Sequence, residues 1–218
     1  MSELPTSELP SSKLPVSELR PHYSSPDARD LILDAALKIF SVSGFEGASI
    51  RQVALAAKVS PPLIHHHFKD KETLWEQVGE RVTADFQAWF KDLSLTDCVV
   101  DKQTIPTLVG AYMAYWKSHP SALRFQLWRV MGTQDQERKR RSEQLNSLFV
   151  PIFARAREAG HIRDDIPPGQ AMITVGGLIQ YWLHSQIEAQ DAIAVGGHSV
   201  PDDQAFLAYV LSLIIRPA

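Results

Sequence analysis

Hydrophobic positions near the start of the chain follow the spacing of one helix face. From residue 32 they recur every three or four positions, and the run ends at Gly44, a residue type that commonly stops a helix. Ser25-Pro26-Asp27 precedes the run with a capping serine, a proline suited to the first helical position and an acidic first turn. We therefore expect an amphipathic helix with an inward face of Ile32, Ala35, Ala36, Ile39, Phe40 and Ser43.

Two shorter helices follow in the pattern. Ser49 and Gln52 have the spacing of a capping box, and the helix that they begin ends near Lys58. Ser60 caps the next helix, and Pro61 stands where a missing N–H group does no harm. Two helices joined by about three residues are typical of a helix-turn-helix.

The rest of the chain predicts further helices and no sheet, because no segment alternates with period two between turn residues. A fourth helix begins at Asp70 and runs toward Phe90. Beyond residue 93, proline and glycine divide the pattern into helices at 105–118, 121–131, 135–159, 168–190 and 203–215. The predicted fold class is all-α.

Residues 1–24 have a different character. Ser-Glu-Leu-Pro-like units repeat every five residues, and the regular prolines disfavour a helix, so we expect a disordered arm. The arm carries three glutamates against Lys13 and Arg20, a sum of −1, which fits poorly with a basic arm that enters the minor groove of DNA.

Composition limits the class of protein. The 218 residues have a net charge of −3 and 44% hydrophobic side chains, enough apolar residues for a globular core. The single cysteine, Cys98, cannot form an intrachain disulfide, which favours a reducing compartment and a cytoplasmic location. The N-terminus lacks a signal-peptide pattern, and the longest uncharged stretch, residues 166–187, is too polar for a bilayer core, so we expect no membrane partner.

Charge along the predicted helix-turn-helix differs in sign from that of the whole chain. Four cations against Asp70 give residues 51–71 a local sum of +3. Three predicted helix N-termini, at Ser49, Ser60 and Asp70, present backbone N–H groups in the same stretch. Cationic side chains and helix N-termini both bind phosphate, so this module favours double-stranded DNA as partner.

The second helix of this module can read the major groove. Ile64, His67 and Phe68 share its inward face, and the outward face is left for a partner. We predict a DNA interface of Ser49, Arg51, Ser60, Pro61, Pro62, Leu63, His65, His66, Lys69 and Lys71. The alternative for Ser49, Arg51 and Lys71 is a role as capping or solvated surface residues.

Residues 29–78, about a quarter of the chain, resemble the TetR family of transcriptional regulators. The resemblance is carried by Gly44-Phe45, the Ser49 cap, the run from Val53 to Ser60, His65-His66-His67-Phe68 and Lys71-Glu72-Thr73-Leu74. It implies a homodimer, most simply a repressor, that binds operator DNA through residues 25–75 and responds to a small molecule bound in a helical domain over residues 76–218.

Three positions depart from the family pattern. Lys58 replaces the usual glycine of the turn, so a left-handed conformation there costs more. His65 replaces the common tyrosine, which would make a phosphate contact through an imidazole. Pro62 removes a backbone donor and favours contact with thymine methyl groups or sugars.

The three consecutive histidines do not predict a metal site. Adjacent side chains on a helix point in different directions, and ligands on one helix prefer a spacing of four. No nucleophile–base pair or glycine-rich phosphate loop supports an enzyme, so we expect neither a catalytic site nor a cofactor. A DNA-binding regulator without a small ligand, or with a protein partner, stays an alternative.

Aromatic residues and methionines gather between residues 112 and 182. Such residues are usually core, but ligand pockets are also apolar with a few polar groups. The same half offers polar partners for a ligand in His119, Arg124, Gln126, Arg129, Gln180 and His184. We predict an apolar or aromatic effector bound by Met113, Trp116, Phe125, Trp128, Phe149, Phe153, Tyr181 and His184.

The last predicted helices favour a homodimer. Residues 204–215 are apolar nearly all round, so one face needs a cover beyond its own domain, and two glycines interrupt the preceding helix. We predict a dimer interface of Gly176, Gly177, Phe206, Tyr209, Val210 and Leu213, with a monomer core as the alternative. The basic run Arg138-Lys139-Arg140-Arg141 predicts a solvated helix face more than a second DNA site.

Overall fold

The computed structural model describes residues 27–91, 99–132 and 135–216. The expectations for the arm at 1–24, for Ser25-Pro26 and for Cys98 lie outside these residues. Within them the fold is all-α, as predicted, and an isolated antiparallel bridge joins Ile162 and Ile215. The helices are α1 (Ala28–Gly47), α2 (Ile50–Ala57), α3 (Pro61–His67), α4 (Lys71–Lys91), α5 (Thr104–Ser118), α6 (Pro120–Met131), α7 (Asp135–Glu158), α8 (Pro168–His184), α9 (Gln186–Val195) and α10 (Asp203–Ser212).

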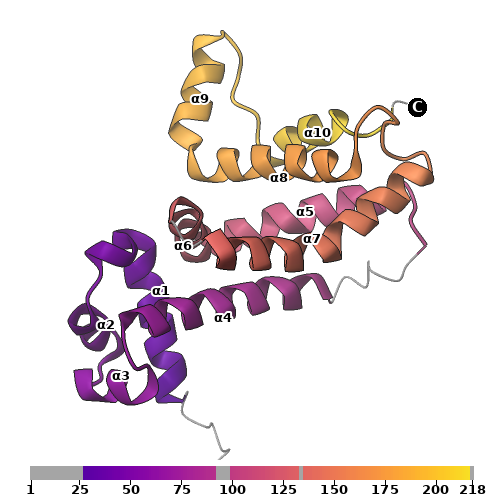
Figure 1. Cartoon of the computed structure of the whole chain (residues 1–218). Helices are drawn as coiled ribbons and strands as arrows, with labels where there is room; N and C mark the ends of the chain where they lie inside the picture. The colour runs from indigo at the N-terminus through magenta and orange to yellow at the C-terminus, as the bar shows by residue number, and fades with distance from the viewer. Residues whose placement is uncertain (1–26, 92–98, 133–134, 217–218) are drawn as a thin grey trace, which may run out of the picture.

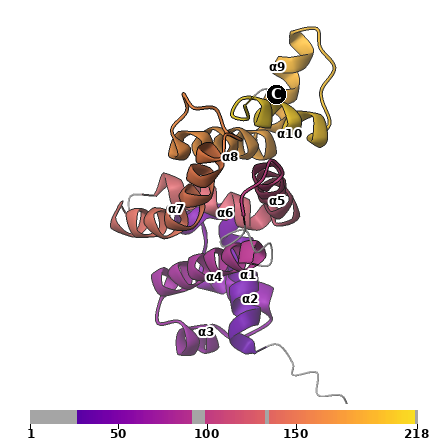
Figure 2. The same ribbon diagram turned by 90° about the vertical axis from the view of Figure 1, so that its right-hand side faces the viewer.

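The helices form an elongated molecule with different ends. Helices α1–α3 lie at one end, α9 and α10 lie at the other, and α4 runs from the first group beneath α5 and α7 (Figures 1 and 2). Because α4 continues through residues 75 and 76, the boundary proposed there falls inside a helix. A single helix therefore continues from the end that carries α1–α3 to a position beneath α5 and α7 (Figure 1).

The first helix begins and ends differently from the sequence pattern. Asp27, and not Ser25, is the N-cap, because its carboxylate accepts a hydrogen bond from the Arg29 backbone N–H at 3.3 Å. Gly44 adopts φ 66° and ψ −172°, and helical turns resume beyond it to Gly47. The glycine thus marks a kink inside α1 and not the end of the helix.

Two C-terminal boundaries also differ from the prediction. The helix expected over 168–190 is two helices, because the chain leaves helical geometry at Ser185, where φ is −118° and ψ is 42°. The Ser185 backbone N–H still donates to the Tyr181 carbonyl at 2.9 Å, which satisfies the end of α8. The last helix ends at Ser212, and a turn at residues 213–214 leads to the bridge between Ile215 and Ile162.

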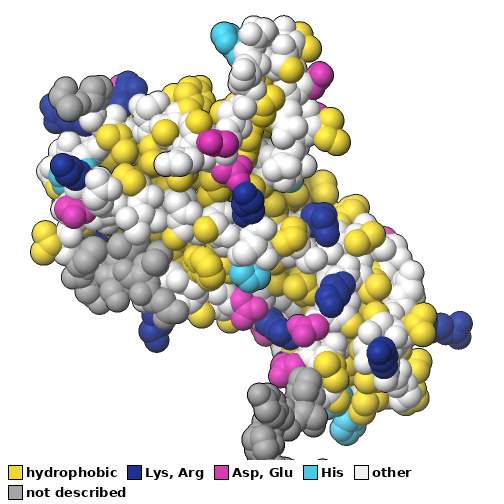
Figure 3. Space-filling view, turned by 180° about the vertical axis from the view of Figure 1, so that it is seen from behind, with side chains coloured by type: hydrophobic (Ala, Val, Ile, Leu, Met, Phe, Trp, Pro, Cys, Tyr) yellow, Lys and Arg dark blue, Asp and Glu magenta, His cyan; other side chains and the backbone are white. Residues whose placement is uncertain are grey.

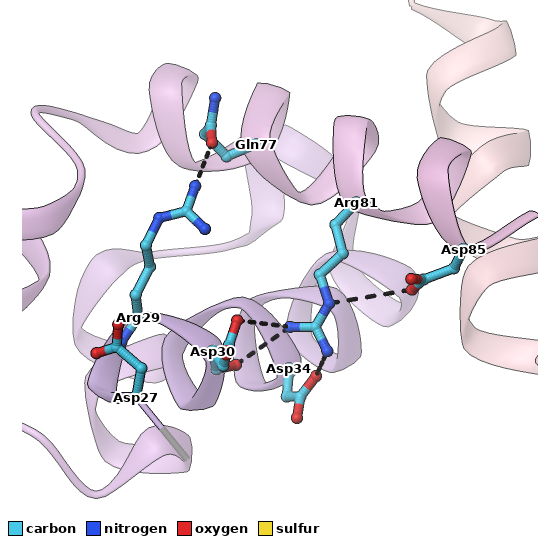
Figure 4. Close-up of polar contacts among 7 residues, drawn as sticks. All are labelled: Asp27, Arg29, Asp30, Asp34, Gln77, Arg81 and Asp85. Carbon is cyan, nitrogen blue, oxygen red and sulfur yellow. Dashed lines mark hydrogen bonds and ion pairs between the residues drawn. The ribbon is translucent and has the colours of Figure 1, made fainter. Parts of the chain in front are cut away.

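Ion pairs fix α1 against α4. The Arg81 guanidinium lies 2.7 Å from a carboxylate oxygen of Asp34, 3.9 Å from one of Asp30 and 4.0 Å from one of Asp85 (Figure 4). These side chains are partly exposed, so each pair contributes little alone. The pairs with Asp30 and Asp34 join α4 to α1, and the pair with Asp85 lies within α4.

An aromatic cluster joins α1, α4 and α6. The ring of Trp75 lies 4.9 Å from that of Phe40 and 4.5 Å from that of Phe125, centroid to centroid, and all three side chains are buried. Trp128 of α6 packs on the kink in α1, and its indole N–H donates to the Ser41 carbonyl at 3.3 Å. Helix α6 therefore packs directly against α1, next to the kink at Gly44.

The Gly44→Ala variant tests the packing of Trp128 on α1. Its backbone lies in a region that only glycine adopts readily, and an added Cβ would meet the Trp128 ring at 3.0 Å. We expect the free energy of unfolding to fall by about 1–3 kcal/mol in urea titrations. Gly169→Ala, where a Cβ meets nothing within 4 Å, is the matched control. Equal stability of the two variants would contradict the tight packing of Trp128 on Gly44.

Candidate nucleic-acid interface and effector cavity

The outward face of α3 is formed as the sequence predicts. Ile64 and Phe68 are buried, which turns Pro61 and Pro62 to solvent. His65 and His66 are also exposed, and a histidine lies at the tip of this lobe in the space-filling view, with Lys and Arg side chains scattered above it (Figure 3). Helix α3 therefore offers its short apolar and imidazole side chains to a partner.

Local caps hold α2 and α3 in place. Ser49 and Gln52 form the predicted capping box, in which the Gln52 N–H donates to Ser49 Oγ at 3.3 Å. Lys58 takes the left-handed conformation, at φ 56° and ψ 40°. Ser60 occupies the N-cap of α3, but its side chain makes no capping hydrogen bond. The first two positions of α3 are prolines, which have no N–H to satisfy, and the Leu63 N–H donates to the Ser60 carbonyl at 3.0 Å.

The cations of the helix-turn-helix fall into two groups. Three of them are exposed: Arg51 in α2, Lys58 at its C-cap and Lys69 just after α3. Lys71 has another task, because its Nζ donates to the carbonyls of Phe45 at 2.9 Å and Ala48 at 3.2 Å. Lys71 therefore satisfies carbonyl groups in the last turn and at the C-cap of α1, and we leave it out of the proposed phosphate contacts.

Asp70 and His65 complete the edge of this surface. Hydrogen bonds from the Thr73 backbone N–H and hydroxyl lower the pKa of the Asp70 carboxyl, so Asp70 caps α4 as an anion. The His65 ring nitrogen Nδ1 lies 3.2 Å from the Lys69 carbonyl oxygen.

In the part of the chain that the structure describes, no group of three His, Cys, Asp or Glu side chains could hold a metal ion.

An apolar cavity of about 350 Å³ lies between α4, α5, α7 and α8. Its volume is within the range of small-molecule sites. Aromatic rings of α4 and α7 form one wall, with the Phe90 and Phe149 centroids 5.1 Å apart. The cavity is lined by Phe86, Phe90, Leu108, Val109, Tyr112, Leu145, Asn146, Phe149, Phe153, Met172, Ile173, Val175, Gly176, Gly177 and Gln180.

The polar groups of the cavity are few and uncharged. Gln180 donates from Nε2 to the Tyr112 hydroxyl at 2.6 Å, which ties α8 to α5 across the cavity. Burial raises the pKa of the Tyr112 phenol, so the hydroxyl stays protonated. With Asn146, these are the polar side chains among the described lining residues, and none of that lining is charged.

The predicted ligand residues are largely displaced from this cavity. Phe149 and Phe153 line it, and so does Gln180, which the sequence suggested as a polar partner. The others do not: Met113, Trp116 and Phe125 are buried core, Trp128 packs on Gly44, and Tyr181 and His184 are exposed on α8.

The lining residues of α4 were missed by the sequence analysis. Phe86 and Phe90 belong to the periodic pattern of that helix, so a signal for a buried face was present. Nothing in the pattern shows which buried rings border a void, because that depends on how four helices meet.

The residues predicted for the dimer interface lie in different environments. Val210 is fully buried, so it belongs to the core and not to a surface between subunits. Phe206 is half-buried and stacks on Trp182 at 4.2 Å. Gly176 and Gly177 line the cavity, although Gly177 is also exposed, and Tyr209 is 59% exposed on α10.

Helices α8 and α10 each keep large apolar side chains in solvent. Ile173 and Tyr181 are exposed at the spacing of one helix face, with Gly177 midway between them. The carboxylate of Asp203 ties α10 to α8 and α5, since it accepts from Trp182 Nε1 at 3.0 Å and pairs with Lys117. Both interactions lower the pKa of the Asp203 carboxyl.

None of the helices described in residues 27–216 has an apolar stretch long enough to cross a bilayer. A helix-turn-helix at one end and a cavity-bearing helical domain at the other define a DNA-binding transcriptional regulator. The model of bacterial regulatory proteins of the tetR family matches residues 32–78, and that of the tetracyclin repressor-like C-terminal domain matches residues 104–206. The chain belongs to the TetR family of transcriptional regulators.

Individual relatives agree with this assignment. The HTH-type transcriptional repressor NicS of Pseudomonas putida is 28% identical over 201 residues, which span 86% of this chain and 91% of NicS. The crystal structure of SCO4942 from Streptomyces coelicolor has a TM-score of 0.65 at 22% identity, covering 87% of this chain and 99% of SCO4942. FadR from Bacillus subtilis, solved in complex with stearoyl-CoA, has a TM-score of 0.65 at 15% identity, covering 84% and 96%.

Substitutions at Arg51 and Lys71 distinguish a cation that contacts phosphate from one that bonds backbone carbonyls. Loss of a phosphate contact should weaken operator binding across sequences and reduce the salt slope by roughly 0.9 per contact. Lys71→Met should leave the slope unchanged and lower the free energy of unfolding by about 1–2 kcal/mol, because two carbonyls lose a donor. Fluorescence anisotropy over a salt series measures the first effect and urea titration the second.

Arg124→Ala, on the exposed surface of α6, is the control for Arg51. A salt slope that is the same in Arg51→Ala and Arg124→Ala would refute the phosphate contact. A shallower slope with full stability in Lys71→Met would return Lys71 to the DNA interface.

Proposed function

We propose that this regulator is a cytoplasmic homodimeric repressor whose operator affinity falls when a small molecule occupies the cavity between α4, α5, α7 and α8. It performs no catalysis in this scheme. The observation that carries the proposal is the position of α4. Its C-terminal half lines the cavity with Phe86 and Phe90, and its N-terminal turn follows α3 directly.

The proposed DNA interface uses the exposed face of α3 and the cations around it. Pro61, Pro62, Leu63, His65 and His66 would face the major groove, while Ser49, Ser60, Arg51, Lys58 and Lys69 would contact the backbone. The prolines and Leu63 offer apolar contacts to thymine methyl groups.

Coupling between the two ends follows from the aromatic cluster. A ligand that displaces Phe86 or Phe90 moves α4, and α4 carries Trp75, which packs on Phe40 of α1 and Phe125 of α6. The recognition helices of a dimer must stand about 34–36 Å apart to enter successive major grooves. A ligand that binds better to another spacing lowers operator affinity by its differential affinity for the two states.

Relatives support repression and ligand sensing. NicS is named a repressor, and FadR from Bacillus subtilis was solved with stearoyl-CoA. An apolar cavity in the corresponding domain of this chain is consistent with a sensor of that kind.

The homodimer is proposed on the exposed apolar face of α8 and α10. Ile173, Tyr181 and Tyr209 would pack against the same residues of a second copy, and Gly177 would let the two α8 helices approach closely. Val210, Phe206 and Leu213 support this face from within.

The test of the regulatory cycle begins with a footprint upstream of the protein's own gene. Small molecules that raise the melting temperature are then added to the protein–operator complex at fixed salt. We expect a ligand that stabilises the protein to weaken operator binding at least tenfold, and Phe149→Ala to reduce its binding. A ligand that stabilises through the cavity and leaves operator affinity unchanged would contradict the coupling.

Tyr209→Asp tests the dimer. A charge in the centre of an apolar interface should weaken association at least tenfold, seen as monomers in sedimentation velocity at micromolar concentration. Val42→Asp, at a residue 71% exposed on α1, is the control and should remain dimeric. A wild-type protein that sediments as a stable monomer would rule out this assembly.

A further inference from the structure

The lining of the effector cavity restricts the charge of its ligand. Most of it is apolar, with Phe86, Phe90 and Phe149 among its rings, and no Asp, Glu, Lys, Arg or His occurs among the described lining residues. An ionised group placed there would lose water and find no counter-ion, which is costly. The cavity therefore favours an uncharged ligand.

Two polar side chains of the lining are partly withdrawn from water. Asn146 is exposed, so solvent can satisfy its amide, but Tyr112 and Gln180 are only partly exposed. Burial raises the pKa of the Tyr112 phenol, which keeps its proton. The hydrogen-bonding capacity of Tyr112 and Gln180 is therefore met largely inside the cavity.

The bond between these two side chains leaves donor hydrogens for a ligand. Gln180 Nε2 donates to the Tyr112 hydroxyl oxygen at 2.6 Å. An amide has two N–H groups and a phenol has one O–H group, so this bond uses one of three donor hydrogens. With the amide turned over, its carbonyl would accept from the phenol, which again uses one of the three. In either orientation the Tyr112–Gln180 pair keeps two hydrogens that can be donated.

A glycine leaves space beside this pair. Gly176 precedes Gln180 by one turn of α8, so the two residues share a face. A Cβ at Gly176 would lie 3.8 Å from the Tyr112 hydroxyl oxygen, in van der Waals contact with it. The missing methyl group therefore leaves room at the hydroxyl for an atom of a ligand.

We propose that the effector is an uncharged, mainly apolar molecule with a carbonyl oxygen that accepts hydrogen bonds from the Tyr112–Gln180 pair. Its apolar body lies among the rings of Phe86, Phe90 and Phe149. A buried donor without an acceptor is costly, so an acceptor is the ligand group that best complements the pair. The inference rests on the proposed ligand-sensing function and specifies the chemical class of the ligand.

Three naphthalenes of similar shape test this class. 2-Acetylnaphthalene has a carbonyl group, 2-ethylnaphthalene lacks it, and 2-naphthoate carries a negative charge. The full-length protein is titrated into a solution of each compound in a calorimeter. Wild-type protein should bind 2-naphthoate about tenfold or more weakly than 2-acetylnaphthalene, because the carboxylate finds no counter-ion in the lining.

The double variant Tyr112→Phe/Gln180→Leu isolates the hydrogen bond. Replacing both partners of a hydrogen bond by apolar groups of similar shape has little effect on stability. Its affinity for 2-acetylnaphthalene should fall roughly fivefold or more, because a buried carbonyl loses its donors, and 2-ethylnaphthalene should bind within about twofold of wild type. Tyr115→Phe removes a phenol from the same helix outside the cavity lining, and this matched control should bind all three compounds like wild type.

Gly176→Ala tests the space beside the hydroxyl without removing a donor. Alanine is more favourable than glycine inside a helix, so this variant should stay folded. Its added methyl group occupies the place of the ligand oxygen, so the affinity for 2-acetylnaphthalene should fall more than that for 2-ethylnaphthalene. Gly169→Ala, in the same helix where a Cβ meets nothing within 4 Å, is the control.

Three results would overturn the inference: equal losses of the two neutral compounds in the double variant, unchanged affinity of that variant for 2-acetylnaphthalene, or 2-naphthoate bound as tightly as the ketone. Failure of both neutral compounds to bind would also overturn it. Release of the operator by a charged ligand would then leave the proposed function standing. Donor-dependent binding of 2-acetylnaphthalene without any loss of operator affinity would count against the proposed function and leave the ligand class of the cavity in place.

Discussion

The packing of Trp75 between Phe40 and Phe125 is the contact on which the arrangement of the two ends depends. These rings belong to α4, α1 and α6, so a single buried cluster joins the first helix of the DNA-binding lobe to α6 of the C-terminal helical domain. Buried aromatic side chains resist rearrangement, because interiors are close-packed and each ring removes a large apolar area from water. A displacement of one of these helices would therefore require the other two to shift or the rings to repack.

The predictable parts of the fold were those set by local chemistry. The capping box at Ser49, the carboxylate cap at Asp70 and the outward face of α3 follow from neighbouring residues, and each is present. The break at Ser185 was not predictable in this way, since no proline or glycine marks it. A serine hydroxyl competes with the helix for backbone groups, but serine also occurs in uninterrupted helices.

The site was harder to predict than the fold, because it depends on which residues meet across helices. Phe149 and Phe153 could be named because they lie in a segment rich in aromatic residues. Trp116 and Phe125 lie in the same segment, yet they are buried in the core. Lys71 shows the same limit for charge. Its position in the sequence suits a phosphate contact, and only the fold reveals the two carbonyls that its ammonium group already binds.

The left-handed backbone at Lys58 has a kinetic consequence. A side chain there costs about 1–2 kcal/mol that glycine would avoid, so the turn between α2 and α3 is less stable than it could be. In return the turn holds an exposed cation on the DNA-facing lobe of a chain whose net charge is −3. Local positive potential speeds the encounter with a polyanion even when the whole molecule is acidic, and salt weakens this effect. In the proposed DNA interface, this turn would give up folding stability for a faster search of DNA.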